Sequence, residues 1–68
     1  MKPISGKNFA KLLERFGWRL LRIQGSHHIY GRPGSEVRLS VPIHKNQMLK
    51  GGLQKHLMKL ADIKEGDF

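Results

Sequence analysis

The 68-residue sequence predicts an α+β fold in which the elements follow the order αβββα. Three observations predict it. Apolar residues recur at helical spacing near both ends, a run rich in Leu and Ile is divided by Gly25, and residues 36–41 alternate between apolar and polar side chains. The simplest assembly is a three-stranded antiparallel sheet with both helices on one face. We expect residues 1–68 to form a single domain.

The first helix is predicted to begin after Ser5, a favourable N-cap residue, and to end at Gly17, which readily adopts the left-handed conformation. Between them, apolar residues recur at the i, i+3, i+4, i+7 spacing of a helix that buries one face. These residues are Phe9, Leu12, Leu13 and Phe16.

Three strands are predicted, over residues 18–24, 26–31 and 36–41. Gly25 separates the first two, and residues 32–35 form a turn in which Pro fixes φ and Gly supplies a positive φ. The alternation in the third strand predicts one buried face and one face open to solvent or ligand. Its inward residues are expected to be Val37, Leu39 and Val41.

The second helix is predicted over residues 53–61, and Ile63 and Phe68 in the tail are expected to dock on the core. Asp62 stands at the helix end, where Gly would adopt the left-handed conformation more easily. The residues expected to be buried are Leu53, Leu57, Leu60 and Ala61. Those expected to face outward are Gln54, Lys55 and Lys59.

The chain is strongly basic, with 13 Lys and Arg against five Asp and Glu and a formal net charge of +8. The first 61 residues hold 12 of these bases and two of the acids, a local charge of +10. Such self-repulsion favours a polyanionic partner, and nucleic acid is the polyanion whose binding releases counterions. No apolar run has the length of a membrane span, so we expect a cytoplasmic protein without a membrane partner.

Neither a metal ion nor another cofactor is expected. The sequence has no cysteine, so thiolate ligands are lacking. Adjacent residues on a strand point to opposite faces, so His27 and His28 are poorly placed to share one ion. No carboxylate lies near them in the sequence to complete a ligand set.

Two function classes fit this composition. The first is RNA binding without catalysis, on an open sheet face flanked by the second helix. The second is metal-independent RNA cleavage, in which a histidine removes the proton of the 2′-OH and cations stabilise charge on the phosphate. Histidine suits that role because its ordinary pKa of about 6.5 lets it exchange protons at neutral pH. The candidate RNA-binding residues in both cases are Arg22, Tyr30, Arg38, Lys55 and Lys59.

Several short motifs follow one another in an order found in a known family. They are Phe16-Gly17-Trp18, Gly25-Ser26-His27 with Tyr30 after it, Val41-Pro42-Ile43-His44, and Gly51-Gly52-Leu53. In this order the chain resembles the HicA-type mRNA interferase toxins over essentially all of its length.

The resemblance implies a fold like that of the double-stranded-RNA-binding domain and endoribonuclease action on mRNA in a bacterial or archaeal cytoplasm. It also implies a HicB-type antitoxin that forms a hetero-oligomer with the toxin. Electrostatic complementarity predicts that such an antitoxin is acidic.

The resemblance implies that His27 is the catalytic histidine, whereas the strand alternation favours His28. Ile29 is expected to face the core, and His27 would then share its face, while His28 and Tyr30 would point outward. A bulge at Gly25-Ser26 would reconcile the two. We expect His27 to be the catalyst, with His28 as the competing candidate, and an auxiliary role for Ser26 and His44.

Overall fold

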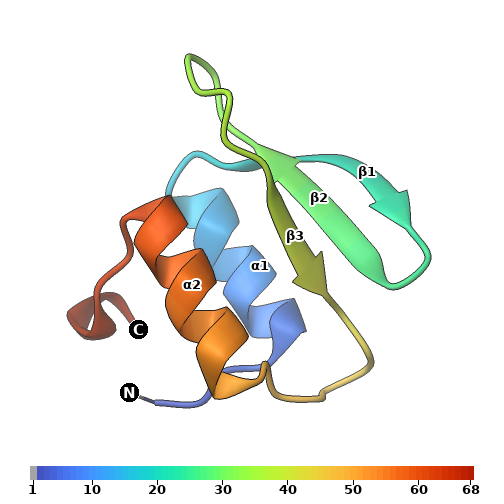
Figure 1. The fold of residues 1–68 in the computed structure, drawn as a ribbon, viewed down its shortest axis with the longest axis vertical. Coiled ribbons are helices and arrows are strands. Elements are labelled where there is room, and N and C mark those ends of the chain that lie inside the picture. The colour runs from blue at the N-terminus through green and yellow to red at the C-terminus, as the bar shows by residue number, and fades with distance from the viewer. Residues whose placement is uncertain (1) are drawn as a thin grey trace.

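The computed structural model describes residues 2–68 and confirms the predicted order αβββα, followed by a single 3₁₀ turn (Figure 1). The three strands form one antiparallel sheet in the order β1-β2-β3, and both helices lie on the same face of it (Figure 1). The elements are α1 (Gly6–Arg15), β1 (Arg19–Gln24), β2 (His27–Gly31), β3 (Leu39–Pro42), α2 (Gly51–Ala61) and η1 (Glu65–Asp67).

Helix α1 begins and ends as its sequence predicts. The Ser5 Oγ accepts a hydrogen bond from the backbone N–H of Asn8 at 3.1 Å, and Gly17 has a φ of 89°. The expectation that Phe16 is buried is wrong, since its side chain is 37% exposed. Phe16 is the C-cap residue with a φ of −96°, outside the helical repeat, and the indole of Trp18 is buried in the core after it.

The sheet is shorter than the sequence predicts at its third strand. Val37 is half-buried and Leu39 and Val41 are buried, so the predicted alternation is confirmed. Pairing nevertheless begins only at Leu39, opposite Tyr30, because β2 ends one residue later at Gly31. Residues 32–38 therefore form a longer loop at that end of the sheet.

Helix α2 begins two residues earlier than predicted and has a different buried face. Leu57 and Ala61 are buried as expected, and Met58 is also buried. Leu60, by contrast, is 39% exposed. The outward position expected for Gln54 is also wrong. Its side chain is 1% exposed, because its Nε2 donates to the carbonyl oxygen of Lys2 at 2.6 Å and so fastens the N-terminal segment to the helix.

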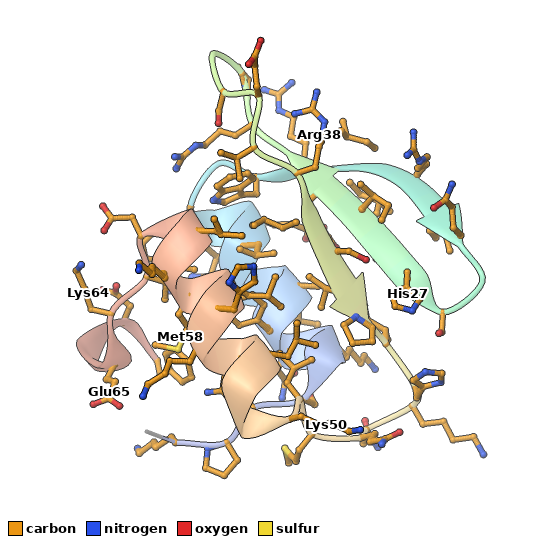
Figure 2. The ribbon with its side chains drawn as sticks, viewed as in Figure 1. His27, Arg38, Lys50, Met58, Lys64 and Glu65 are labelled. Atoms are coloured by element: carbon orange, nitrogen blue, oxygen red, sulfur yellow. The ribbon has the colours of Figure 1, made fainter. Side chains whose placement is uncertain are left out.

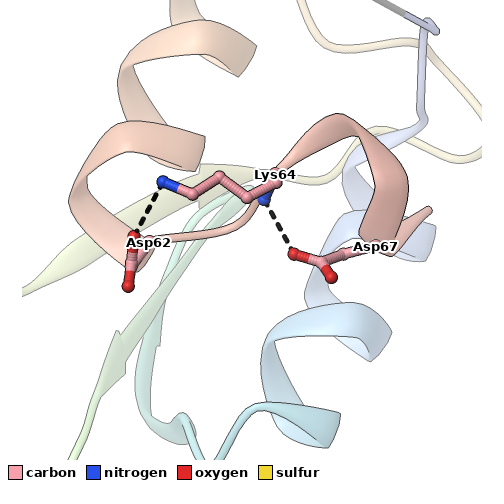
Figure 3. Close-up of polar contacts among 3 residues, drawn as sticks. All are labelled: Asp62, Lys64 and Asp67. Atoms are coloured by element: carbon pink, nitrogen blue, oxygen red, sulfur yellow. Dashed lines mark hydrogen bonds and ion pairs between the residues drawn. The ribbon is translucent and has the colours of Figure 1, made fainter.

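The chain after α2 is held by local polar contacts of Lys64 (Figure 3). Asp62 ends the helix in the left-handed conformation, with a φ of 57°, and accepts from the Lys64 Nζ at 3.1 Å. The Lys64 backbone N–H donates to the Asp67 carboxylate at 2.8 Å. Ile63 is buried as predicted, whereas Phe68 is 38% exposed, contrary to expectation.

The first residue of α1 touches the last residue of β3. A Cβ on Gly6 would collide with the carbonyl oxygen of Pro42, which is a backbone atom and cannot rotate away. Pro42 pairs with His27 in the sheet, so this close approach fixes the position of the strand end beside that histidine.

Gly6→Ala is expected to destabilise the protein by about 1–3 kcal/mol, the usual effect of forcing extra volume into a packed contact. Gly51 is the matched control, because it is also the first residue of a helix but has open space around its Cβ position. Gly51→Ala should leave stability unchanged or raise it by up to ~1 kcal/mol. Urea unfolding of both variants tests this, and equal effects would contradict the proposed close contact.

Candidate functional site

The face of the sheet away from the helices carries His27. Residues directly opposite each other in antiparallel strands share a face. Tyr30 pairs with Leu39 and His28 with Val41, and the core contains Tyr30, Leu39 and Val41. His27 and Ile29 alternate with these residues and therefore lie on the other face. We call this the outer face, and on it lie Arg22, Gln24, His27, Ile29, Gly31, Arg38 and Ser40.

The expectation from strand alternation that His28 points outward is therefore wrong. It assumed that Ile29, the more apolar residue, faces the core. In the structure the larger Tyr30 ring does so, and Ile29 lies outside the core cluster between Arg22 and Ser40 in the register. His27 needs no bulge at Gly25-Ser26, because these two residues form the tight hairpin turn and the irregularity lies between Leu20 and Arg22.

Ser40 holds the imidazole of His27 across the strand pair. The His27 Nδ1 lies 3.0 Å from the Ser40 Oγ, and both side chains are solvent-exposed. This contact leaves Nε2 of the ring as the nitrogen available to a ligand. His28 is half-buried on the opposite face, opposite Val41, and does not share this environment.

The position expected for Tyr30 on the open face is wrong, because its side chain is 3% exposed. Burial raises the pKa of its phenol above the ordinary value of 10.0, and the nearby Glu14 carboxylate, which accepts its hydrogen bond, raises the pKa further. Tyr30 thus connects β2 to α1 and positions the strand that carries His27. Its ring is not part of the outer face.

The expected basic residues divide between two layers of the molecule. Arg22 pairs with Ile29 in the register and Arg38 lies over Gly31, so both are on the outer face with His27. Lys55 and Lys59 are exposed on α2, in the helix layer that covers the opposite face of the sheet. The expectation that they flank the open sheet face is not met.

The two auxiliary residues lie near the His27 end of the sheet. The Ser26 carbonyl accepts from the backbone N–H of Ile43 at 2.8 Å, which ties the β1–β2 turn to the end of β3. His44 lines a cavity of about 340 Å³ between the connector and the start of α2, with Pro42 at its edge. Its imidazole belongs to the connector, whereas His27 lies on the sheet.

An exposed histidine on a sheet face that also carries arginines can exchange a proton with a bound anion. The guanidinium groups supply positive charge to a phosphate, and the imidazole supplies a base or an acid at the same face. Among residues 2–68, no group of three His, Asp or Glu side chains could hold a metal ion. In the same part of the chain, no helix has the length and apolarity to cross a membrane.

The fold and this site define a small basic α+β protein whose free sheet face is suited to a polyanion. A family model described as the HicA toxin of bacterial toxin-antitoxin matches residues 6–63. The chain therefore belongs to the HicA toxin family, the toxin side of toxin–antitoxin systems, in which an antitoxin is the partner. No curated protein matches this chain.

Tyr30→Phe is expected to lower the free energy of unfolding by about 1 kcal/mol at neutral pH, through loss of the hydrogen bond to Glu14. The raised pKa of Tyr30 makes the native state favour the protonated phenol. The contribution of Tyr30 to the free energy of unfolding is thus complete below pH 10 and is lost as the pH rises through its higher folded-state pKa.

Urea unfolding at pH 8 and pH 11 measures this contribution. The wild type should lose more stability between the two pH values than Tyr30→Phe does. Equal losses would show that burial of Tyr30 does not couple to its ionisation.

Proposed function

We propose that this toxin is a metal-independent endoribonuclease that cleaves mRNA with His27 as general base. The observation that carries the proposal is the His27–Ser40 contact of 3.0 Å on an exposed face that also presents Arg22 and Arg38. An mRNA substrate implies that the toxin acts in the cytoplasm of a bacterial or archaeal host.

The reaction uses the RNA's own nucleophile. With the Nδ1 proton donated to Ser40, the neutral His27 accepts the 2′-OH proton at Nε2. The 2′ oxygen attacks the adjacent phosphorus, the bond from phosphorus to the 5′ oxygen breaks, and that oxygen takes a proton from water. The products are a 2′,3′-cyclic phosphate and a 5′-OH end. Arg22, on the neighbouring strand, stabilises the negative charge that develops on the phosphoryl oxygens, while Arg38 at the far end of the face contacts another part of the RNA.

His27→Ala is expected to lower the cleavage rate by at least 10²-fold, the scale of general acid–base catalysis, while the fold and most RNA affinity are retained. The measurement is cleavage of a single-stranded RNA in EDTA, with identification of the product ends. His28→Ala is the matched control, and it should retain activity because His28 lies on the other face.

Ser40→Ala should reduce the rate less than His27→Ala does, since it removes only the group that orients the imidazole. If His28→Ala were inactive and His27→Ala active, His28 would be the general base and the proposed role of His27 would be wrong. If purified, antitoxin-free protein binds RNA but leaves it intact, the protein is a non-catalytic RNA-binding module.

The proposed RNA interface lies on the outer face, so arginines there should control the salt dependence of affinity. Arg22→Gln with Arg38→Gln should reduce the slope of log affinity against log salt by about 1–2, because each phosphate contact contributes roughly 0.7 for single strands. Lys55→Gln with Lys59→Gln removes the same charge from the helix layer and should change the slope less. Equal slopes for the two double variants would contradict an interface confined to the outer face.

We further propose that the antitoxin is an acidic HicB-type protein that forms a hetero-oligomer with this chain and covers the strand that carries His27. The charge of +10 over the first 61 residues favours an acidic partner and speeds its encounter. Coverage of His27 would stop the chemistry even where RNA still contacts the rim.

The expected result is that an acidic protein encoded beside this toxin co-purifies with it and suppresses RNA cleavage. Co-purification should survive His27→Ala, because a stable interface buries far more area than one imidazole. A complex that cleaves RNA at the rate of the free toxin would contradict coverage of the site.

A further inference from the structure

A hollow at the end of the outer face remote from His27 has the features of a nucleotide-binding subsite. We propose that it holds one phosphate and the adjoining base of a single-stranded RNA, and so anchors the RNA that reaches His27; this use in cleavage rests on the function proposed above. The hollow has a volume of about 230 Å³. It is lined by Arg19, Leu21, Gly31, Arg32, Pro33 and Arg38.

Arg19 and Arg38 carry the positive charge of the hollow, and the Arg38 guanidinium is held in place by contacts within the protein. The Arg38 Nη1 donates to the carbonyl oxygens of Ser35 at 3.3 Å and Val37 at 3.1 Å. Arg32 lines the hollow, but its guanidinium lies 4.4 Å from the centre of the buried Trp18 ring and so is on the core side of the sheet. Within residues 2–68, neither Arg38 nor Arg19 forms an ion pair. The hollow therefore presents ordered positive charge without a counterion, which suits a phosphate.

Gly31 forms the floor of the hollow. A Cβ at this position would lie 2.7 Å from the Leu21 Cδ1 and 3.1 Å from the Arg38 Nη1. Only a residue without a side chain lets both groups lie this close to the strand. The hollow thus depends on glycine for its shape, and a small substitution there would displace the leucine and the arginine together.

One wall of the hollow is apolar and exposed. The Leu21 side chain is 52% exposed, and Pro33, which also lines the hollow, is exposed. An apolar wall next to guanidinium groups accommodates an unstacked base joined to its phosphate. A duplex would keep its bases stacked and leave this wall unused, so the ligand we assign is single-stranded.

The hollow and His27 lie on one face at opposite ends of β2. His27 and Gly31 are four residues apart on the strand, about 14 Å at the usual rise per residue. Figure 2 shows His27 and Arg38 at the two ends of the sheet. Phosphates advance at least 3.4 Å per nucleotide along an RNA chain. An RNA anchored in the hollow therefore reaches His27 after roughly two to four nucleotides.

The test uses a 2′-O-methyl hexaribonucleotide, which lacks the 2′-OH nucleophile and stays intact whether or not the protein is a nuclease. Arg19→Gln alters the hollow alone, and Arg15→Gln, an exposed arginine at the end of α1, is the control with equal charge change. Gly31→Ala keeps every charge and fills the floor. Thermal unfolding of each variant confirms that it is folded.

Arg19→Gln and Gly31→Ala should each raise the Kd for the hexanucleotide about tenfold, against less than twofold for Arg15→Gln. Equal Kd values for Arg19→Gln and Arg15→Gln would overturn the subsite. It would also be overturned if Arg19→Gln weakened binding of a poly-glutamate peptide but not of RNA, since the hollow would then receive an acidic protein.

Cleavage of an unmodified dinucleotide, too short to span both positions, separates the two proposals. If the dinucleotide is cleaved equally by the wild type and Arg19→Gln while an unmodified hexanucleotide requires Arg19 for a low KM, both proposals are supported. If the wild type cleaves neither RNA but binds the hexanucleotide through Arg19, the subsite is correct and the nuclease function is wrong.

Discussion

The packing of both helices against a single face of the sheet is the constraint on which the rest of this structure depends. The core is formed by side chains of α1, α2, β2 and β3, among them Tyr30, Leu39 and Val41, together with Trp18, Leu49 and Ile63 from the connecting segments. A chain of this length buries only about 60% of the surface of its unfolded state, too little to cover a second sheet face. The outer face therefore remains open, and His27 on it is accessible to a ligand.

This one-sided core also selects the histidine. A side chain on a strand faces either the core or solvent according to its parity with the buried residues. Tyr30 satisfies its phenol by hydrogen bonding to Glu14 and fills the core, so His28 turns inward and His27 turns outward beside Ser40. The contact between Gly6 and Pro42 then holds the strand end next to His27 in place.

The charge of the chain follows the same division. Basic residues occur on both layers, but those on the outer face stand beside a histidine and an arginine-lined hollow, whereas Lys55 and Lys59 stand on a helix. A polyanion is attracted by the whole field, which acts over a Debye length of about 8–10 Å and beyond at low salt. Chemistry, by contrast, requires contact at one face. The net charge therefore indicates what kind of partner binds, whereas the position of a residue on the sheet or on the helices indicates whether it belongs to the site.

The sequence by itself determined the fold class, the order of elements and the caps of α1, because Ser5, Gly17 and the helical apolar spacing are local signals. The motif Gly25-Ser26-His27 also indicated the family from residues alone. Only the tertiary structure decided that Tyr30 and Gln54 are buried and that Phe16, Leu60 and Phe68 are exposed. These outcomes depend on hydrogen bonds to Glu14 and Lys2, and on the rotation of a helix against the sheet. The distribution of basic residues between the two layers could not be predicted from the sequence either. A linear pattern shows how residues alternate but not which of the two sheet faces the helices will cover.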